Sequence, residues 1–153
     1  MTDINHDKEK KIISVICFAN YCRSPVAEKI LQAKYHSQFK FMSAGIMPYA
    51  DISMDNRSKE YLNEKGIKDN FHIPKKINSK LIDESSLIFA MDFEILIALN
   101  KMGISSDKLR LYSFQNKDVF IPDPFKLGKP EYKKIMDKIY QIADEMDFTF
   151  LGN

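Results

Sequence analysis

Short apolar runs alternate along this chain with longer segments in which apolar residues recur every three or four positions. The clearest run covers residues 12–18, which are rich in isoleucine and valine and therefore predict a buried β-strand. Further apolar runs at residues 39–43, 87–91 and 109–112 predict three more strands.

The segments between these runs carry the helical spacing. The first begins at Arg23-Ser24-Pro25, where we expect Ser24 to cap the helix and Pro25 to lie in its first turn. Two more helices are predicted from about Asp55 to Gly66 and from Asp92 through Met102. A last helix follows a long loop at residues 114–129, and its predicted core-facing stripe consists of Tyr132, Ile135, Met136, Ile139, Tyr140, Ala143 and Met146.

Strands that alternate with helices favour βαβ units and therefore a parallel sheet of the α/β class. Right-handed crossovers place the loops that follow such strands at one edge of the sheet, where ligands bind. Cys17, Ser43 and Asp92 each lie at or just after a predicted strand end, so we expect them at this edge.

Composition narrows the class of protein. The chain has 153 residues, 44% of them hydrophobic and 29% charged, as expected for one globular domain at residues 11–153 after a flexible tail at 1–10. A net charge of +2 gives no sign of nucleic-acid binding. Neither a signal peptide nor a run of about 20 apolar residues is found, so the sequence predicts a cytoplasmic protein without a membrane partner.

Cys17 and Arg23 are the most informative residues in the sequence, because a strand ends at the first and a helix begins at the second. The N-terminus of a helix favours an anion, and the same field stabilises a thiolate. A guanidinium beside it can bind a phosphate with two hydrogen bonds. The alternative is that Cys17 is only a small buried hydrophobic residue, as many free cysteines are.

The stretch from Cys17 to Pro25 reads Cys-Phe-Ala-Asn-Tyr-Cys-Arg-Ser-Pro and resembles the active-site loop of the low-molecular-weight protein tyrosine phosphatases, Cys-x-Gly-Asn-x-Cys-Arg-Ser-Pro. The resemblance continues in order through nearly the whole chain after the first ten residues. Its further segments are Ser43-Ala44-Gly45, Asp55-Asn56-Arg57, Met91-Asp92 and Asp123-Pro124. It implies a single domain with a four-stranded parallel sheet between two helical layers, and it implies hydrolysis of phosphotyrosine in proteins without a metal or cofactor.

The resemblance also implies a role for each residue of the loop. Cys17 would be the nucleophile that forms a cysteinyl phosphate, and Arg23 would clamp the phosphate. Ser24 would donate its hydroxyl to the thiolate, a role that we weigh equally with helix capping. The rest of the phosphate cradle would consist of Phe18, Ala19, Asn20, Tyr21 and Cys22.

Asp123 lies between two prolines in Pro122-Asp123-Pro124, which restrict its loop. Taken alone, this sequence is more typical of a simple turn. The resemblance instead implies that Asp123 protonates the departing tyrosyl oxygen and then activates water.

Around the loop, the resemblance implies a supporting hydrogen-bond network of Asn20, Ser43 and His72, joined by Ser24. From the sequence alone, His72 is expected to be an exposed loop residue. Asp92 is expected to cap its helix or to support the site. The expected aromatic walls of the substrate pocket are Tyr21, Tyr49 and Phe125.

Ala19 stands where the family usually has glycine. If that position needs a positive φ, alanine costs about 1 kcal/mol or more. Because Cys17 and Cys22 share one loop, we also expect reversible oxidative inactivation through a disulfide between them.

Three other functions remain open at this stage. Arsenate reductases that use this fold relay a disulfide through further cysteines, but this chain has only Cys17 and Cys22. Protein-arginine phosphatases carry a small threonine where this chain has Tyr21. A phosphoprotein-binding module without activity is disfavoured by the presence of Cys17, Arg23 and Asp123 together. The expected partner is a phosphotyrosine protein, and the expected assembly is a monomer or a weak self-association.

Overall fold

The computed structural model describes residues 10–49 and 52–152. Its four-stranded sheet is entirely parallel, with the strand order β2-β1-β3-β4. The strands are β1 (Lys11–Cys17), β2 (Phe39–Gly45), β3 (Ser85–Ala90) and β4 (Leu109–Leu111). The helices are α2 (Arg23–Tyr35), α3 (Asn56–Glu64), α4 (Ser79–Glu84), α5 (Phe93–Lys101) and α6 (Lys129–Asp144), with short 3-10 turns at Ser106–Lys108 and Thr149–Leu151.

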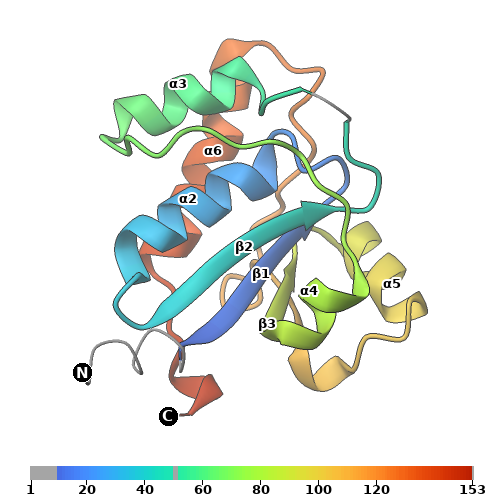
Figure 1. Cartoon of the computed structure of the whole chain (residues 1–153). Helices are drawn as coiled ribbons and strands as arrows, with labels where there is room; N and C mark the ends of the chain where they lie inside the picture. The colour runs from blue at the N-terminus through green and yellow to red at the C-terminus, as the bar shows by residue number, and fades with distance from the viewer. Residues whose placement is uncertain (1–9, 50–51, 153) are drawn as a thin grey trace.

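The sheet forms the middle of three layers, with α2, α3 and α6 on one face and α4 and α5 on the other (Figure 1). Successive side chains of a strand point to opposite faces, and both faces here are apolar. In β1, Ile13 and Val15 pack toward α2 and α6, whereas Ile16 packs toward α4 and α5. The predicted α/β fold with a four-stranded parallel sheet is therefore confirmed.

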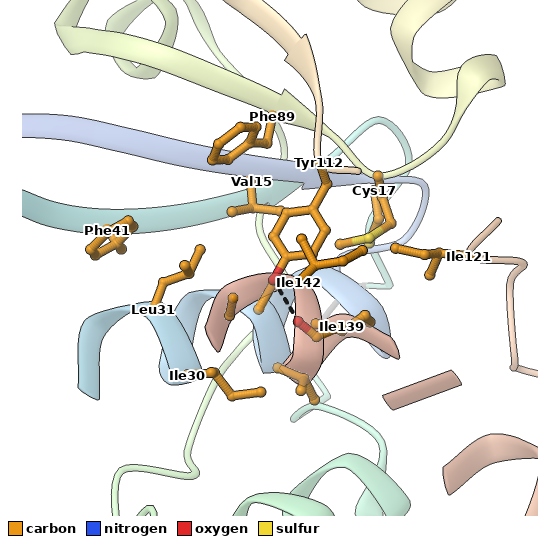
Figure 2. Packing of buried hydrophobic residues seen from close by; sticks show 14 of the residues in the cluster. Val15, Cys17, Ile30, Leu31, Phe41, Phe89, Tyr112, Ile121, Ile139 and Ile142 are labelled. Atoms are coloured by element: carbon orange, nitrogen blue, oxygen red, sulfur yellow. Dashed lines mark hydrogen bonds between the residues drawn. The ribbon is translucent and has the colours of Figure 1, made fainter. Parts of the chain in front are cut away.

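Tyr112 anchors the larger of the two core layers. Its side chain is fully buried directly after β4, beside Phe89 of β3. Its hydroxyl donates to the backbone carbonyl of Ile139 in α6 at 2.8 Å, which satisfies a polar group that would be costly to bury alone (Figure 2). The contact fixes α6 against the carboxyl end of the sheet, on the side where Cys17 lies.

Several element boundaries differ from the sequence predictions. Ser24 does not cap α2, because the helix begins at Arg23 and Cys22 occupies the N-cap position without a side-chain cap. The short helix α4 was missed, although Asn78 caps it by accepting from the N–H of Leu81 at 2.8 Å. β2 runs two residues further than expected, to Gly45.

The remaining regions agree with the sequence in outline. Gly66 follows α3 with φ of +74°, the left-handed conformation that glycine adopts freely at helix ends. The segment between β4 and α6 forms only turns and irregular structure. Of the predicted tail at residues 1–10, all but Lys10 lie outside the described residues. Within the described part of the chain, no helix is long and apolar enough to cross a membrane.

Candidate active site

A cavity of about 130 Å³ opens at the carboxyl end of β1, between the loop that leads into α2 and the segment before α6. Its lining contains most of the residues that the sequence singled out, and these residues come from segments that span more than 100 positions of the chain. They are Cys17, Phe18, Ala19, Tyr21, Cys22, Arg23, Tyr49, Asp123 and Phe125.

Cys17 lies at the floor of this cavity with 3% of its surface exposed. Its Sγ atom is 2.9 Å from the hydroxyl oxygen of Ser24, which in turn accepts a hydrogen bond from Asn20 Nδ2 at 2.8 Å. With its acceptor side used by Asn20, the Ser24 hydroxyl can direct its proton toward a thiolate. The predicted helix cap is thus replaced by a contact with the sulfur.

Asn20 holds the loop from inside. Its Nδ2 also donates to Ser43 Oγ at 3.0 Å, and its Oδ1 accepts from His72 Nε2 at 2.7 Å and from the Lys75 N–H at 3.0 Å. Four hydrogen bonds use all the bonding capacity of the amide. Asn20, Ser24, Ser43 and His72 therefore form one connected network beneath Cys17.

Asn20 is also the only non-glycine residue of the described chain with a positive φ, at 53°. Asparagine tolerates the left-handed conformation better than most residues. Ala19 does not adopt it. The loop therefore does not incur the backbone strain that would follow if alanine occupied a position that requires positive φ.

Gly45 was quoted in the sequence motif, but its structural reason appears only in three dimensions. A Cβ atom at this position would lie 2.8 Å from the backbone nitrogen of Asn20 and 2.8 Å from the carbonyl oxygen of Phe18. The end of β2 thus lies directly against the active-site loop. Only glycine allows that approach.

His72 is buried, which contradicts the exposed position expected from the sequence alone. Burial, with a further contribution from the ammonium groups of Lys29 and Lys75, lowers the pKa of His72 to about 4. The ring is consequently neutral near pH 7, and its Nε2–H is the donor that matches the Asn20 carbonyl oxygen. Ser43 completes the network by donating to Glu28 at 2.7 Å.

Arg23 is 3% exposed and is held by two acceptors. Its Nη1 donates to Asp92 Oδ2 at 2.7 Å and to the carbonyl oxygen of Ile121 at 2.9 Å. Asp92 uses its other oxygen to cap α5, through the N–H of Ile95 at 2.9 Å. Both expectations for Asp92, capping and support of the site, are therefore met by one carboxylate.

Asp123 reaches the cavity from the opposite side, on an exposed loop. Its Oδ1 accepts from the backbone N–H of Phe125 at 3.1 Å, which orients the side chain locally. Arg57 ties the loop to the rest of the molecule by donating to the carbonyl oxygens of Leu127 at 2.6 Å and Phe125 at 3.0 Å. Sequence reasoning had left the role of Arg57 open.

Asp55 connects these two sides of the site. Its carboxylate accepts from Arg57 Nε at 3.0 Å and from Nη2 at 2.8 Å, and its N–H donates to the carbonyl oxygen of Tyr21 at 3.0 Å. It is also the N-cap of α3. Sequence reasoning placed Asp55 at a helix start and missed this connecting position.

The three predicted aromatic walls lie together at the mouth of the cavity. The ring centroids of Tyr21 and Tyr49 are 5.0 Å apart, and Phe125 lies 6.0 Å from Tyr21 and 5.9 Å from Tyr49. These are normal spacings for edge-to-face aromatic contacts. A flat aryl group entering the cavity would meet rings from three separate segments.

Cys22 and Cys17 are both buried and both free thiols. Burial raises the pKa of the Cys22 thiol to about 12, and its Sγ is 3.9 Å from Asp55 Oδ2. Ser58 donates to the backbone carbonyl of Cys22 at 3.0 Å. The disulfide between Cys17 and Cys22 stays a prediction.

No group of three or more metal-ligating side chains is present in residues 10–49 and 52–152. The cavity brings together a thiol, a guanidinium, a carboxyl group on the facing side and an aromatic entrance. Such a set can transfer a phosphoryl group to sulfur and release it to water.

Comparison with known proteins gives the class that this fold and site define. The family model described as low molecular weight phosphotyrosine protein phosphatase matches residues 12–147. The chain belongs to this family, and it is a phosphatase.

Particular relatives agree with that assignment. The low molecular weight protein-tyrosine-phosphatase Ptp of Acinetobacter johnsonii is 33% identical over 117 residues, which cover 75% of this chain and 80% of that protein. The crystal structure of the Erwinia amylovora tyrosine phosphatase AmsI is 25% identical, with a TM-score of 0.78 over 88% of this chain and 89% of that one. The YwlE arginine phosphatase of Geobacillus stearothermophilus is 26% identical, with a TM-score of 0.79 and 88% coverage of both chains.

Proposed function

We propose that this protein hydrolyses phosphotyrosine in proteins, with Cys17 as the nucleophile, Arg23 as the phosphate clamp and Asp123 as general acid and base. The observation that carries the proposal is the 130 Å³ cavity, which has all three side chains on its walls and aromatic rings at its mouth. The substrate is a phosphotyrosine-containing protein, and we expect a monomer or a weak self-association.

In the first step, the Cys17 thiolate attacks phosphorus and the bond between phosphorus and the tyrosyl oxygen breaks. Asp123, in its protonated form, gives its proton to that oxygen, so tyrosine leaves as a neutral phenol. The Arg23 guanidinium and the backbone N–H groups of residues 18–23 bind the equatorial phosphoryl oxygens. Asp92 and the Ile121 carbonyl support this role by holding the guanidinium in a fixed plane.

In the second step, water attacks the cysteinyl phosphate and the bond between sulfur and phosphorus breaks. Asp123 is now a carboxylate and accepts the proton from the water, which restores the starting acid. Ser24, at 2.9 Å from the sulfur, donates a hydrogen bond to the departing thiolate. Phosphate is released, and the reaction uses no cofactor.

The mechanism is tested by trapping the intermediate. Loss of the base in Asp123→Asn slows the second step, so a phosphoryl group should accumulate on the peptide that contains Cys17. Denaturation in SDS at alkaline pH during turnover, followed by mass spectrometry, would locate it. Adding Cys22→Ser to Asp123→Asn gives the matched control, and this double variant should keep the label. A label on any other residue, or none in either variant, would contradict the role of Cys17.

A protein-arginine phosphatase is the second candidate, because the similar YwlE structure has that activity in its name. Tyr21 is the discriminating residue, since its ring closes the entrance by contact with Tyr49 and Phe125. We expect a higher kcat/KM for phosphotyrosine than for phosphoarginine peptides. Tyr21→Thr should narrow the difference, whereas the matched variant Tyr21→Phe should keep it. A wild-type preference for phosphoarginine would favour the second candidate.

A further inference from the structure

A cavity that shares no lining residue with the substrate cavity lies elsewhere on the same side of the molecule as α5. It has a volume of about 450 Å³, compared with about 130 Å³ at Cys17. It lies beyond the carboxyl ends of β3 and β4, between the start of α5 and the segment 113–121. Its lining is mostly apolar and includes Phe93, Leu96, Phe114 and Phe120. This volume lies within the range of about 300–1,000 Å³ that is usual for small-molecule sites in proteins.

This cavity, which we call the rear cavity, shares its wall with the groups that hold Arg23. Asp92 and Ile121 both line it, and they are the two acceptors of Arg23 Nη1. An occupant would therefore touch the residues that orient the guanidinium without entering the substrate cavity.

One wall of the rear cavity also lines another cavity. Asp118, Val119 and Phe120 line the rear cavity on one side and a second cavity of about 330 Å³ on the other. Lys138 Nζ of α6 donates to the Phe120 carbonyl oxygen at 3.1 Å, and Val119 packs against the apolar core. Ile121, which is buried, and Pro122 then lead directly to Asp123. Contacts made in the rear cavity thus act on a stretch with cavities on two sides that is continuous with the proposed acid.

The lining also indicates the chemistry of the occupant. Phe93 and Phe120 are 64% and 65% exposed, an unusual position for two phenyl rings beside one hollow. Arg110 and Lys117 lie on the lining and form no ion pair among the described residues. Two carboxylates lie there as well, but Asp92 is paired with Arg23, so only Asp118 opposes the two cations. An aromatic molecule with one negative charge matches this surface.

We propose that the rear cavity is a regulatory site for a small aromatic monoanion, such as an aryl carboxylate or sulfonate. Its ring system occupies the apolar hollow and its charge faces Arg110 and Lys117. Binding fixes the segment 119–121 and so slows the loop that carries Asp123. The proposal of a binding site depends only on the cavity, whereas the proposed effect on turnover depends on the proposed roles of Arg23 and Asp123.

Anilinonaphthalene sulfonate is a suitable probe, because it is an aromatic monoanion whose fluorescence rises in apolar surroundings. We expect saturable binding to the full-length protein with one probe per chain. Orthovanadate, a tetrahedral oxyanion that occupies a phosphate site, should leave this binding unchanged. Displacement of the probe by orthovanadate would place it at Cys17 and overturn the proposal.

The Kd of the probe in variants whose side chains fill the rear cavity shows whether the probe binds there. Val119→Trp should raise its Kd at least about tenfold, and Leu96→Trp should do the same from the facing wall. Lys117→Glu should raise the Kd about threefold or more, because it reverses one charge beside the anion. Lys80→Glu on α4 is the matched charge control and should bind as the wild type does. Circular dichroism shows which variants are folded, and unchanged affinity in a folded Trp variant would overturn the site.

Turnover of an aryl phosphate, measured as the amount of phosphate released, tests whether occupancy of the rear cavity affects catalysis. Saturating probe should lower kcat about two- to fivefold, and the inhibition should persist at high substrate concentration. Val119→Trp should show less inhibition at the same probe concentration. Inhibition that disappears at high substrate, or kcat and KM unchanged at saturating probe, would overturn the coupling. Because binding is measured without turnover, failure of the proposed function would leave the fluorescence result intact.

Discussion

The two halves of the candidate site are built in opposite ways. The loop from Cys17 to Ser24 has its polar side chains buried, and Asn20 alone makes four hydrogen bonds. The segment from Ser113 to Gly128 contains no strand or helix, carries an exposed Asp123 and has cavities on both sides of Val119. The proposed nucleophile, Cys17, is therefore held in a preorganised loop, whereas the proposed acid, Asp123, lies on an exposed segment next to cavities.

The difference fits what each half has to do. Donors that stabilise a phosphoryl group are most effective when they are already in place and need no reorganisation. In the proposed mechanism Asp123, in contrast, exchanges its partner between the leaving oxygen and a water, and the product passes it. A more open loop allows both steps.

The largest effect is expected from the preorganised half. Cys17→Ser should lower turnover of an aryl phosphate at least about a thousandfold, because a serine hydroxyl at neutral pH is a far weaker nucleophile than a thiolate. Steady-state assays with near- and far-UV circular dichroism would separate this loss from unfolding. Turnover comparable to that of the wild type in the folded variant would remove the central claim.

The acid loop should give a smaller effect that depends on the substrate. Asp123→Asn should lower kcat/KM, which reports the first step, about a hundredfold or more for phenols with high pKa, and much less for activated phenols that leave without a proton. A plot of log kcat/KM against leaving-group pKa should become steeper in the variant. An equal loss across the series would show that Asp123 does not act as the acid.

Arg57 offers a way to loosen the acid loop without touching the reacting atoms. Arg57→Leu removes the donors to Phe125 and Leu127, so we expect kcat to fall about tenfold, with faster proteolytic cleavage of the loop. Glu60→Gln is the control, because it breaks only the exposed pair with Lys129 at 3.6 Å. Equal kcat and cleavage rates in wild type and Arg57→Leu would argue against a positioning role.

A further prediction concerns the pH dependence of stability and leaves turnover aside. The pKa of His72 is about 4 when folded and 6.5 when unfolded, so the unfolded state binds more protons between these values. The neutral ring therefore makes its full contribution to the free energy of unfolding above pH 6.5. This contribution, on the order of 3 kcal/mol in total, is lost as the pH falls toward 4.

The comparison for this prediction is His72→Gln, which replaces the imidazole with an amide that still offers an N–H donor but cannot titrate. Urea unfolding at several pH values should give a flatter dependence for the variant between pH 6.5 and 4. The Asp and Glu carboxylates titrate in both proteins, so their contributions to the free energy of unfolding cancel in the difference. Parallel curves would mean that His72 is not protonated preferentially in the unfolded state.

The strands were predictable because β1 and β3 are apolar on both faces, which gives near-continuous hydrophobic runs. α4 was not, because it has only six residues and depends on the Asn78 cap and on burial of Leu81. The capping prediction for Ser24 was wrong for a related reason. The local sequence, a hydroxyl residue directly before Pro25, is typical of a helix cap. The contact of Ser24 with Cys17, however, depends on the three-dimensional path of the loop.

Within the site, motif order correctly grouped residues that the cavity brings together, while their chemical roles stay predictions. The burial of His72 was not predictable from its neighbours, since Phe71 and Ile73 beside it are both exposed. The same holds for Gly45, whose close approach to Asn20 depends on the register of β1 against β2.

The placement of the supports has a consequence for synthesis on the ribosome. The loop with Cys17 is synthesised before the residues that hold it, which lie far downstream in the sequence. Ser58 donates to the Cys22 carbonyl and lies 2.6 Å, hydroxyl to hydroxyl, from Tyr132 in α6. A nascent chain therefore carries Cys17 long before it can assemble the site, and we expect activity to begin only when α6 has left the exit tunnel.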